Sequence, residues 1–592
     1  MKKLSEIMPA LITVIVLLLP VSATKAQEMN EMWGGNVEIK QSGNRGRFFA
    51  DGNYCMFIHW GLYSGIANKW NGKTYYGNAE WIMSPYMANI PLDEYKDVAK
   101  EFNPIEFNAK EVAQLAKDAG MKYIIITSKH HDGFAMYHSE ANKFNIVDAT
   151  PYGRDPMKEL SDACRELGLG FGFYYSHNQD WTYPGGAGGP QVDHEGNKKT
   201  FDDYFNEKCL PQVEEITKNY GEIELVWFDT PGDMPQKYSQ HLVDVVHRNQ
   251  PSALVSGRVG YELGDYRTLG DMEAPLENIE GLWEGINVTN DSWGYAWYDN
   301  NWKTPKQILT MLITTVARGG TFMLNIGPDG SGRIPAPARQ SLLSAGKWIA
   351  RYPQVIYGAG ASPWKHALPW GDATVQGNKI FLAVYDWPVN GELWLPGLQT
   401  QIEEINLVSG DKNQKLAFTR NADWTNIKIP NNSPDDFVSI IEVSLKGEAK
   451  VDNIMAVDPV AGLHIPALFA KTVNCSVGYR EWMEKFGEWK HAYNVKEWTQ
   501  GSIASWDVNI KDEGIYNIDL TYMGQGRMIW EVSTDEGYTI QNQQNSSNIY
   551  ARYPIGWIKF DKPGKHTISV KLLEGNTENT GLTAISVTPV RF

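Results

Sequence analysis

The stretch Glu224-Leu-Val-Trp-Phe-Asp-Thr230 decides how the first half of this chain folds. Its run of apolar residues is typical of a short strand that is buried on both faces. Asp229 ends the run, and a Pro-Gly pair after Thr230 breaks the chain directly behind it. A carboxylate in this position either caps a turn or acts as a nucleophile at the mouth of a β/α barrel. Because side chains alternate along a strand, Trp227 and Asp229 point the same way, which predicts an indole beside a carboxylate in one pocket.

Strands and helices alternate from about residue 50 to about residue 350, which predicts an α/β layer with parallel strands. Polar or aromatic side chains stand where several of the expected strands end. These residues are His59, His130, His131, Tyr174, Tyr175 and Asp229. In a closed barrel the carboxyl ends of all parallel strands meet at one face. We therefore expect these side chains to surround one pocket of a (β/α)8-like TIM barrel.

The sequence changes character after about residue 360, where helical periodicity fades and short strands with turn signals take over. Strands are expected at 379–385, 392–395 and 437–442, and in a later segment at 516–522, 528–532 and 566–571. The predicted organisation is a signal peptide over 1–26, a β/α barrel over 27–358, an antiparallel β-sandwich over 359–450 and a second β-sandwich over 451–592.

The N-terminus has the pattern of a secretory signal. Lys2 and Lys3 precede an uncharged apolar stretch, and small residues up to Ala26 offer a cleavage site, so we expect a periplasmic or secreted protein. No other stretch is long and apolar enough to span a membrane after signal removal. The formal net charge of −16 disfavours nucleic acid as a partner. The 4 scattered cysteines are too few for a disulfide framework or a zinc site.

The expected barrel mouth carries the groups that cleavage of a glycosidic bond requires. This reaction usually needs two carboxyl groups, and the sugar needs hydrogen-bonding partners for its hydroxyls and an apolar surface for its ring. Asp229 supplies one carboxylate. The polar groups are His59, His130, His131, Tyr174 and Arg258, and the aromatic surfaces are Trp60, Trp81, Trp227 and Trp293.

Several short motifs resemble those of the α-L-fucosidases of glycoside hydrolase family 29. They are His59-Trp-Gly-Leu-Tyr63, Glu80-Trp81, Lys129-His-His-Asp-Gly-Phe134, Tyr174-Tyr-Ser176, Trp227-Phe-Asp229, Ser292-Trp-Gly-Tyr295 and Leu324-Asn-Ile-Gly-Pro328. The resemblance implies an irregular barrel that lacks some helices. It implies an exo-acting, retaining enzyme that releases terminal α-L-fucose by double displacement. It also implies no cofactor and no metal, and a fucosylated oligosaccharide or glycoconjugate as the partner.

The resemblance assigns roles to particular residues. Asp229 is expected to be the nucleophile, and Trp293 is expected to lie near the fucose methyl group. With Trp227 and Arg258 from the strand ends, the expected substrate-binding residues are His59, Glu80, Trp81, His130, His131, Tyr174, Trp227, Arg258 and Trp293. The acid/base residue varies in position across the family. Glu273 is the preferred candidate here, and Asp271, Glu277 and Glu284 are alternatives.

Some alternatives remain open at this point. A metal-dependent hydrolase could use His59, His130, His131 and Asp132, although adjacent strand residues point to opposite faces unless the backbone turns. The chain could also be a non-catalytic glycan-binding protein, or an exo-α-L-galactosidase, because an apolar pocket rejects an added hydroxyl only weakly. The last segment resembles β-sandwich carbohydrate-binding modules, and a structural sandwich without a ligand is the alternative.

Overall fold

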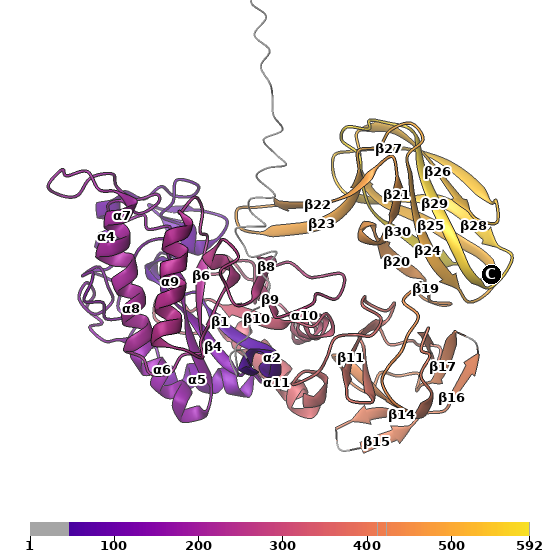
Figure 1. Ribbon diagram of the computed structural model, residues 1–592, viewed down its shortest axis with the longest axis horizontal. Helices are drawn as coiled ribbons and strands as arrows, with labels where there is room; N and C mark the ends of the chain where they lie inside the picture. Colours follow the sequence, from indigo (N-terminus) through magenta and orange to yellow (C-terminus); the bar gives the residue numbers. More distant parts are fainter. Residues whose placement is uncertain (1–46, 411, 422, 591–592) are drawn as a thin grey trace, which may run out of the picture.

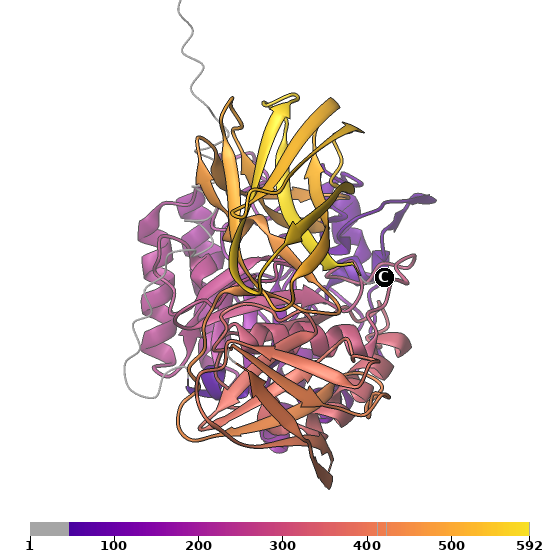
Figure 2. The ribbon, with the colours of Figure 1, turned by 90° about the vertical axis from the view of Figure 1, so that its right-hand side faces the viewer.

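The structure, a computed structural model, describes residues 47–410, 412–421 and 423–590. The predicted signal peptide over 1–26 lies outside these residues. A β/α part is followed by two β-parts that lie along one side of it (Figure 1). Seen from that side, one β-part lies above the other in front of the β/α part (Figure 2).

The β/α part is built on one sheet of eight strands, all of which pair in parallel in the order β7-β6-β5-β4-β1-β10-β9-β8. The strands are β1 Tyr54–Ile58, β4 Tyr123–Lys129, β5 Gly170–Ser176, β6 Leu225–Asp229, β7 Leu254–Val255, β8 Arg267–Asp271, β9 Trp283–Val288 and β10 Thr321–Ile326. Between the two edge strands a single parallel bridge joins Ser256 to Tyr266. The sheet therefore closes into a barrel in which the contact between the edge strands β7 and β8 is irregular.

Helices cover the outside of this sheet and follow most of its strands (Figure 1). The longer ones are α5 Ala109–Asp118, α6 Pro156–Leu167, α8 Leu210–Lys218, α9 Gln236–Asn249, α10 Pro305–Ala317 and α11 Ala336–Arg351. Only a short 3-10 turn separates β7 from β8, and the described chain from β8 to β9 contains no helix. The predicted fold class, an irregular (β/α)8-like barrel followed by antiparallel β-sheets, is confirmed.

The helix starts follow the local sequence. The side chains of Asn108 and Asp155 accept hydrogen bonds from backbone N–H groups in the first turns of α5 and α6. Thr304 and Gln307 form a capping box at the start of α10. These caps fix where each helix begins after its strand, and so they fix the length of the loops at the barrel mouth.

The first β-part packs a five-stranded sheet against a three-stranded one. The larger sheet has the order β11 Gly371–Gln376, β12 Lys379–Val384, β18 Ser439–Leu445, β14 Ile402–Ser409 and β15 Lys412–Lys415, and the smaller has β13 Glu392–Pro396, β17 Trp424–Lys428 and β16 Phe418–Asn421. Apolar side chains from both sheets, among them Leu382, Leu393 and Ile441, form one core.

The second β-part, called the third domain below, contains two six-stranded sheets that share one core. One sheet holds β19 Met455–Val457, β24 Ile503–Ile510, β29 Gly564–Glu574, β26 Gly526–Thr534, β27 Thr539–Ser546 and β21 Lys471–Val473. The other holds β22 Ser476–Met483, β23 Trp489–Lys496, β30 Gly581–Pro589, β25 Gly514–Met523, β28 Ala551–Phe560 and β20 Leu463–Pro466. Strands β22 and β23 form a hairpin that extends from this domain towards the barrel (Figure 1).

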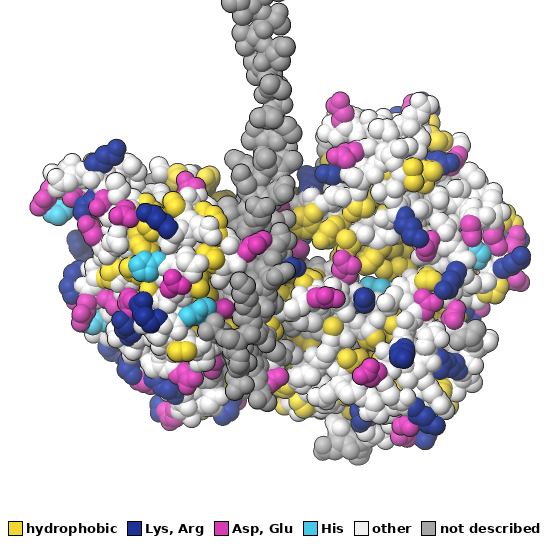
Figure 3. All heavy atoms as spheres, in the orientation of Figure 1, with side chains coloured by type: hydrophobic (Ala, Val, Ile, Leu, Met, Phe, Trp, Pro, Cys, Tyr) yellow, Lys and Arg dark blue, Asp and Glu magenta, His cyan; other side chains and the backbone are white. Residues whose placement is uncertain are grey.

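Two surface properties bear on partners. Among the described residues, no helix has both the length and the apolarity that a bilayer crossing requires. On the face shown in Figure 3, basic and acidic side chains are interspersed over both the barrel and the β-parts. This face therefore has no broad basic surface of the kind that binds nucleic acid.

Candidate active site

A small pocket opens at the carboxyl ends of the barrel strands. It is lined by Phe57, His59, Asn78, Glu80, Trp81, His130, Trp227, Asp229, Arg258, Asp271, Ile286 and Trp293. Its lining combines carboxyl, imidazole and indole groups, which suits the polar hydroxyls and the apolar face of a sugar ring. Of the strand-end residues predicted from the sequence, His59, His130 and Asp229 line this pocket, and His131 and Tyr174 contact Asp229. Tyr175 is a correction, because it lies on the other face of β5 and donates to Gln212 of α8 at 2.9 Å.

Asp229 is the last residue of β6 and is held by three neighbours. Arg258 Nη1 donates to its Oδ1 at 3.2 Å, the Tyr174 hydroxyl donates to its Oδ2 at 2.9 Å, and His131 Nε2 lies 3.6 Å from Oδ2. Burial raises the pKa of Asp229, but Arg258, His131 and the Tyr174 hydrogen bond outweigh burial and leave the pKa below its usual value. The carboxylate is therefore ionised and oriented, as a nucleophile must be.

His59 follows β1 directly, and its tautomer can be deduced from its neighbours. Asn325 Nδ2 donates to the Trp293 carbonyl at 2.7 Å, which turns the Asn325 amide oxygen towards His59 Nδ1, also at 2.7 Å. Because an amide oxygen only accepts, Nδ1 carries the proton. Burial lowers the pKa of His59 to about 4, so Nε2 is an unprotonated acceptor for a sugar hydroxyl.

His131 is fixed in the same way by the end of β5. The Ser176 hydroxyl donates to the Gln179 carbonyl at 3.0 Å and therefore accepts from His131 Nδ1 at 2.6 Å. Burial lowers the pKa of His131 to about 4. His131 Nε2 and Asp229 Oδ2 are then two acceptors side by side, an arrangement that a sugar hydroxyl can satisfy by donating to one of them.

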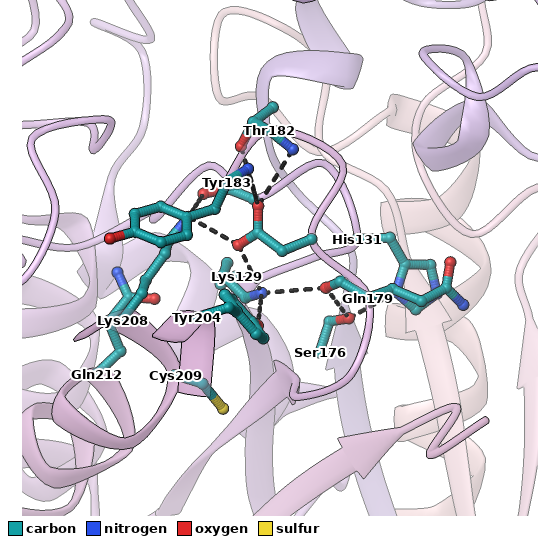
Figure 4. Close-up of polar contacts among 12 residues, drawn as sticks. Lys129, His131, Ser176, Gln179, Thr182, Tyr183, Tyr204, Lys208, Cys209 and Gln212 are labelled. Carbon is teal, nitrogen blue, oxygen red and sulfur yellow. Dashed lines mark hydrogen bonds and ion pairs between the residues drawn. The ribbon is translucent and has the colours of Figure 1, made fainter. Parts of the chain in front are cut away.

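A buried ion cluster supports this arrangement from below (Figure 4). Lys129 Nζ donates to the Gln179 carbonyl at 3.2 Å and to the Asp180 carboxylate at 3.1 Å. Lys208 Nζ donates to the same carboxylate at 2.7 Å. All three charged side chains are almost fully buried, so each depends on the others for compensation of its charge. Lys129 thus fixes the carbonyl that orients Ser176 and, through it, His131.

The motif Lys129-His-His-Asp132 divides into pocket and core residues. Strand β4 ends at Lys129 and the chain then turns, so the rings of His130 and His131 lie together, with centroids 4.2 Å apart. His130 Nδ1 is buried and has no hydrogen-bond partner among the described residues. Asp132 instead accepts from the Tyr95 hydroxyl at 2.5 Å and does not line the pocket.

His130, His131 and Asp229 have ligand atoms within 4.8 Å of one another, a spacing that could hold a metal ion. This group differs from the metal set considered from the sequence, because Asp132 lies in the core. Arg258 places a positive charge against Asp229, which opposes the binding of a cation at the same carboxylate.

The pocket aromatics form its floor and rim. Trp227 Nε1 donates to Glu284, and its ring stacks on Tyr174 at 5.4 Å with the Arg258 guanidinium 4.9 Å from its ring centre. Trp293 packs on His59 at 5.3 Å, and Trp81 lies 5.1 Å from the His131 ring. The prediction that Trp60 belongs to the aromatic surface of the pocket was wrong. Trp60 is fully buried, stacks on Phe107 at 4.7 Å and lies in the barrel core.

The candidate acid/base residues are placed very differently. Asp271 ends β8, lines the pocket, and accepts from Arg258 Nη2 at 2.6 Å, so one guanidinium joins it to Asp229. Glu273 does not line the pocket and accepts from the Gly270 N–H at 2.9 Å. Glu277 is exposed on the same loop. Glu284 is fully buried on β9 and receives the Trp227 N–H, so the indole separates it from the pocket. The geometry therefore favours Asp271 over the preferred Glu273.

Glu80 is nearly as buried as Glu284 but faces the pocket. Its Oε2 accepts from the Gly294 N–H at 2.9 Å. Burial, and to a smaller extent Asp271 and Asp229, raise the pKa of Glu80 to about 8. At neutral pH the side chain is therefore a neutral acid that can donate one hydrogen bond to a sugar hydroxyl.

This proton predicts an alkaline limit to activity. Because the pKa of Glu80 is raised in the folded protein, Glu80 keeps its proton at low pH and loses it as pH rises through about 8. With the proton it also loses the hydrogen bond that it can donate to a sugar hydroxyl. We expect kcat/KM on an aryl α-L-fucoside to fall over this range. Glu80→Gln keeps a neutral donor and an acceptor for Gly294, so its activity should not show this fall. A decline that persists in Glu80→Gln but disappears in Glu284→Gln, where burial raises the pKa to about 7, would contradict the assignment.

Sequence reasoning missed several contributors to the site. Phe57 and Ile286 point inward from β1 and β9 and form the apolar floor, which strand alternation could have revealed. Asn78 lines the pocket, and its N–H donates to the carbonyl of Phe486 in the β22–β23 hairpin at 3.1 Å. No local signal in the sequence connects residues so far apart.

Comparison with known proteins identifies the family of the barrel. The family model described as "Alpha-L-fucosidase" matches residues 21–354. The α-L-fucosidase of Dictyostelium discoideum is 28% identical over 411 residues, 65% of this chain and 87% of that protein, and human tissue α-L-fucosidase is 26% identical over 62% of this chain and 81% of that protein.

Two solved structures extend the likeness beyond the barrel. The crystal structure of the α-L-fucosidase from Vibrio sp. strain EJY3 is 29% identical, has a TM-score of 0.74, and covers 91% of this chain and 97% of its own. The α-L-fucosidase isoenzyme 1 from Paenibacillus thiaminolyticus is 32% identical, has a TM-score of 0.61, and covers 68% of this chain and 99% of its own. With the family model spanning the whole barrel, this chain belongs to the α-L-fucosidase family of glycoside hydrolases.

Proposed function

We propose that this α-L-fucosidase is exo-acting and retaining, with Asp229 as nucleophile and Asp271 as acid/base. The observation that carries the proposal is the single guanidinium of Arg258, which binds both carboxylates at the edge of the pocket. A retaining glycosidase needs its two carboxyl groups about 5 Å apart, and an inverting one about 6.5–9.5 Å. Two carboxylates on one guanidinium suit the closer arrangement.

In the first step, an Asp229 oxygen attacks C1 of the fucose from the face opposite the leaving group. The bond between C1 and the leaving oxygen breaks, and that oxygen takes the proton of Asp271. In the second step, water attacks C1, Asp271 accepts a proton from it, and the ester to Asp229 breaks with its electron pair returning to the carboxylate. Product and substrate then share the same configuration at C1.

The neighbours of Asp229 support this sequence. Tyr174 and Arg258 hold the carboxylate in one rotamer, so little reorganisation is needed before attack. His59, His130 and His131 are proposed to bind the fucose hydroxyls as neutral imidazoles.

The apolar side chains Phe57, Ile286 and Trp293 are proposed to surround the fucose methyl group. L-galactose carries a hydroxyl at that position, and an apolar pocket discriminates against a hydroxyl by about a hundredfold at most. We therefore expect the enzyme to prefer fucose over L-galactose but not to exclude L-galactose. Export remains a proposal that rests on the signal-like segment at residues 1–26, and fucosylated oligosaccharides or glycoconjugates are the proposed partners.

The function is tested with purified protein on aryl α-L-fucoside, aryl α-L-galactoside and a fucosylated oligosaccharide. We expect the fucoside to be the better aryl substrate and free fucose to be the only sugar of low mass released from the oligosaccharide, as an exo-acting enzyme requires. Mass spectrometry that found internal fucan fragments would overturn the exo-acting mode. Full activity in the presence of a chelator is expected, and chelator-sensitive activity would assign His130, His131 and Asp229 to a metal site instead.

A further inference from the structure

The β22–β23 hairpin, residues 476–496, is held only in part by the domain to which it belongs. Among the described residues its strand pairing with the rest of the sheet is confined to Val495 with Leu582. Of its two strands, only Asn494 and Val495 are buried, and the outer part projects towards the barrel (Figure 1). An isolated two-stranded hairpin is at best marginally stable in water, so this one needs a second surface.

The barrel mouth is that surface. At the hairpin tip the Phe486 carbonyl accepts from the Asn78 N–H at 3.1 Å, and Lys485 Nζ lies 3.1 Å from the Asp291 carboxylate. The Phe486 ring packs edge-on against Trp81 at 5.3 Å. Asn78 and Trp81 both line the catalytic pocket, so the hairpin tip stands at the rim of that pocket.

Nearer its base the hairpin makes hydrogen-bond contact with the segment that carries Asp271. His491 Nε2 lies 2.6 Å from the Asp271 carbonyl oxygen, which only accepts, so Nε2 carries the proton. The Tyr479 hydroxyl is hydrogen-bonded to His491 Nδ1 and acts as its donor when the imidazole is neutral. Asp271 is thus held at both ends, by His491 at its carbonyl and by Arg258 at its carboxylate.

The segment around Asp271 is held irregularly within the barrel. The pairing of β8 with β9 shifts register between Thr268 and Asp271. Met272, the next residue, has a φ of 60°, a left-handed conformation that side chains other than Gly and Asn rarely adopt. A strained backbone persists only where its surroundings enforce it, and His491 belongs to those surroundings.

We propose that His491 is a positioning residue for Asp271, so that the third domain completes the leaving-group side of the active site. This inference rests on the proposed role of Asp271 as acid/base. It adds a role for the third domain that neither a carbohydrate-binding module nor a structural sandwich would have. A shift of about 1 Å in a catalytic group can cost about a hundredfold in rate, which sets the scale of the expected effect.

The test compares two substrates in His491→Ala. On a fucosyl disaccharide, whose leaving group needs a proton, kcat/KM should fall by about tenfold to a hundredfold. On a dinitrophenyl fucoside, whose leaving group needs none, kcat/KM should stay within about threefold of wild type. His491→Gln keeps one donor and one acceptor and should recover most of the loss. Tyr479→Phe removes the hydroxyl that partners Nδ1 and also contacts Glu273, and it should show the same pattern more weakly.

Arg480→Ala is the matched control, because Arg480 pairs across the hairpin with Ala492 and its guanidinium contacts Trp482 and Tyr550 of the third domain. It should leave both substrates unaffected. The decisive measurement is a double mutant: if His491 acts through Asp271, then His491→Ala should cost nothing further in an Asp271→Ala background.

The outcomes separate the two proposals. Equal losses on both substrates in His491→Ala, or a further loss in the double mutant, would overturn the positioning role while leaving Asp271 as acid/base. An Asp271→Ala enzyme with no dependence on the leaving group would overturn the acid/base assignment itself, whatever His491 does. An absence of fucosidase activity in the wild-type protein would overturn the function.

Discussion

Asp229→Gly should lower kcat on an aryl α-L-fucoside by at least about a thousandfold, which corresponds to about 4 kcal/mol of barrier. The variant removes the atom that is proposed to bond to C1, and nothing else in the pocket can replace it. His131, Tyr174 and Arg258 all lose a partner, but Arg258 keeps Asp271 and so is not left as an unpaired buried charge. We therefore expect the folded state to survive, as measured by thermal unfolding.

Rescue by added azide would show that the lost activity is due to the missing nucleophile. The cavity left by Asp229→Gly admits a small anion on the face from which the carboxylate attacked, so added azide should restore turnover and give β-fucosyl azide. Asp233→Gly is a matched control: it removes an exposed carboxylate from the loop that follows β6, and its activity should equal that of wild type. Turnover of Asp229→Gly within about tenfold of wild type, without azide, would show that another group is the nucleophile.

Much of this site could be predicted from the sequence because its residues lie at the ends of regular elements. Asp229 and His59 are each preceded by a short apolar strand, and parallel strands bring such ends to one face. The prediction failed for residues that were assigned to the pocket because they are next to a pocket histidine in the sequence. Asp132 follows the paired histidines, yet it accepts a hydrogen bond from Tyr95 behind the pocket. Trp60 follows His59 directly but packs in the core.

The second carboxylate was harder to place because its surroundings are irregular. No helix follows β8, the β8–β9 register shifts, and the chain near Asp271 is held by residues more than two hundred positions away. A loop with several acidic residues gives no local pattern that tells one from another. The distinction between Asp271 and Glu273 depends on which one faces Arg258, and that is a property of the tertiary structure alone.

That distinction leads to the second large effect. Asp271→Ala should lower kcat/KM on a fucosyl disaccharide by about a hundredfold to ten-thousandfold, the usual contribution of general acid catalysis. The first step on dinitrophenyl fucoside should be nearly unaffected, because dinitrophenolate leaves without a proton. Water then attacks the ester slowly for want of a base, so the ester to Asp229 should accumulate and produce a burst of dinitrophenol.

Azide distinguishes this variant from the nucleophile variant, because azide needs no base and should attack the accumulated ester. Attack on the β-linked ester inverts C1 once more, so the product should be α-fucosyl azide, the opposite anomer to that from Asp229→Gly. Glu273→Ala is the matched comparison on the same loop and should stay within about tenfold of wild type on both substrates, since its carboxylate faces the Gly270 N–H rather than the pocket. If Glu273→Ala gave the burst and the α-azide while Asp271→Ala did not, the acid/base role would belong to Glu273, and a loop movement on substrate binding would be required to bring it in. A β-fucose first product from the wild-type enzyme, seen by NMR, would rule out retention for either residue.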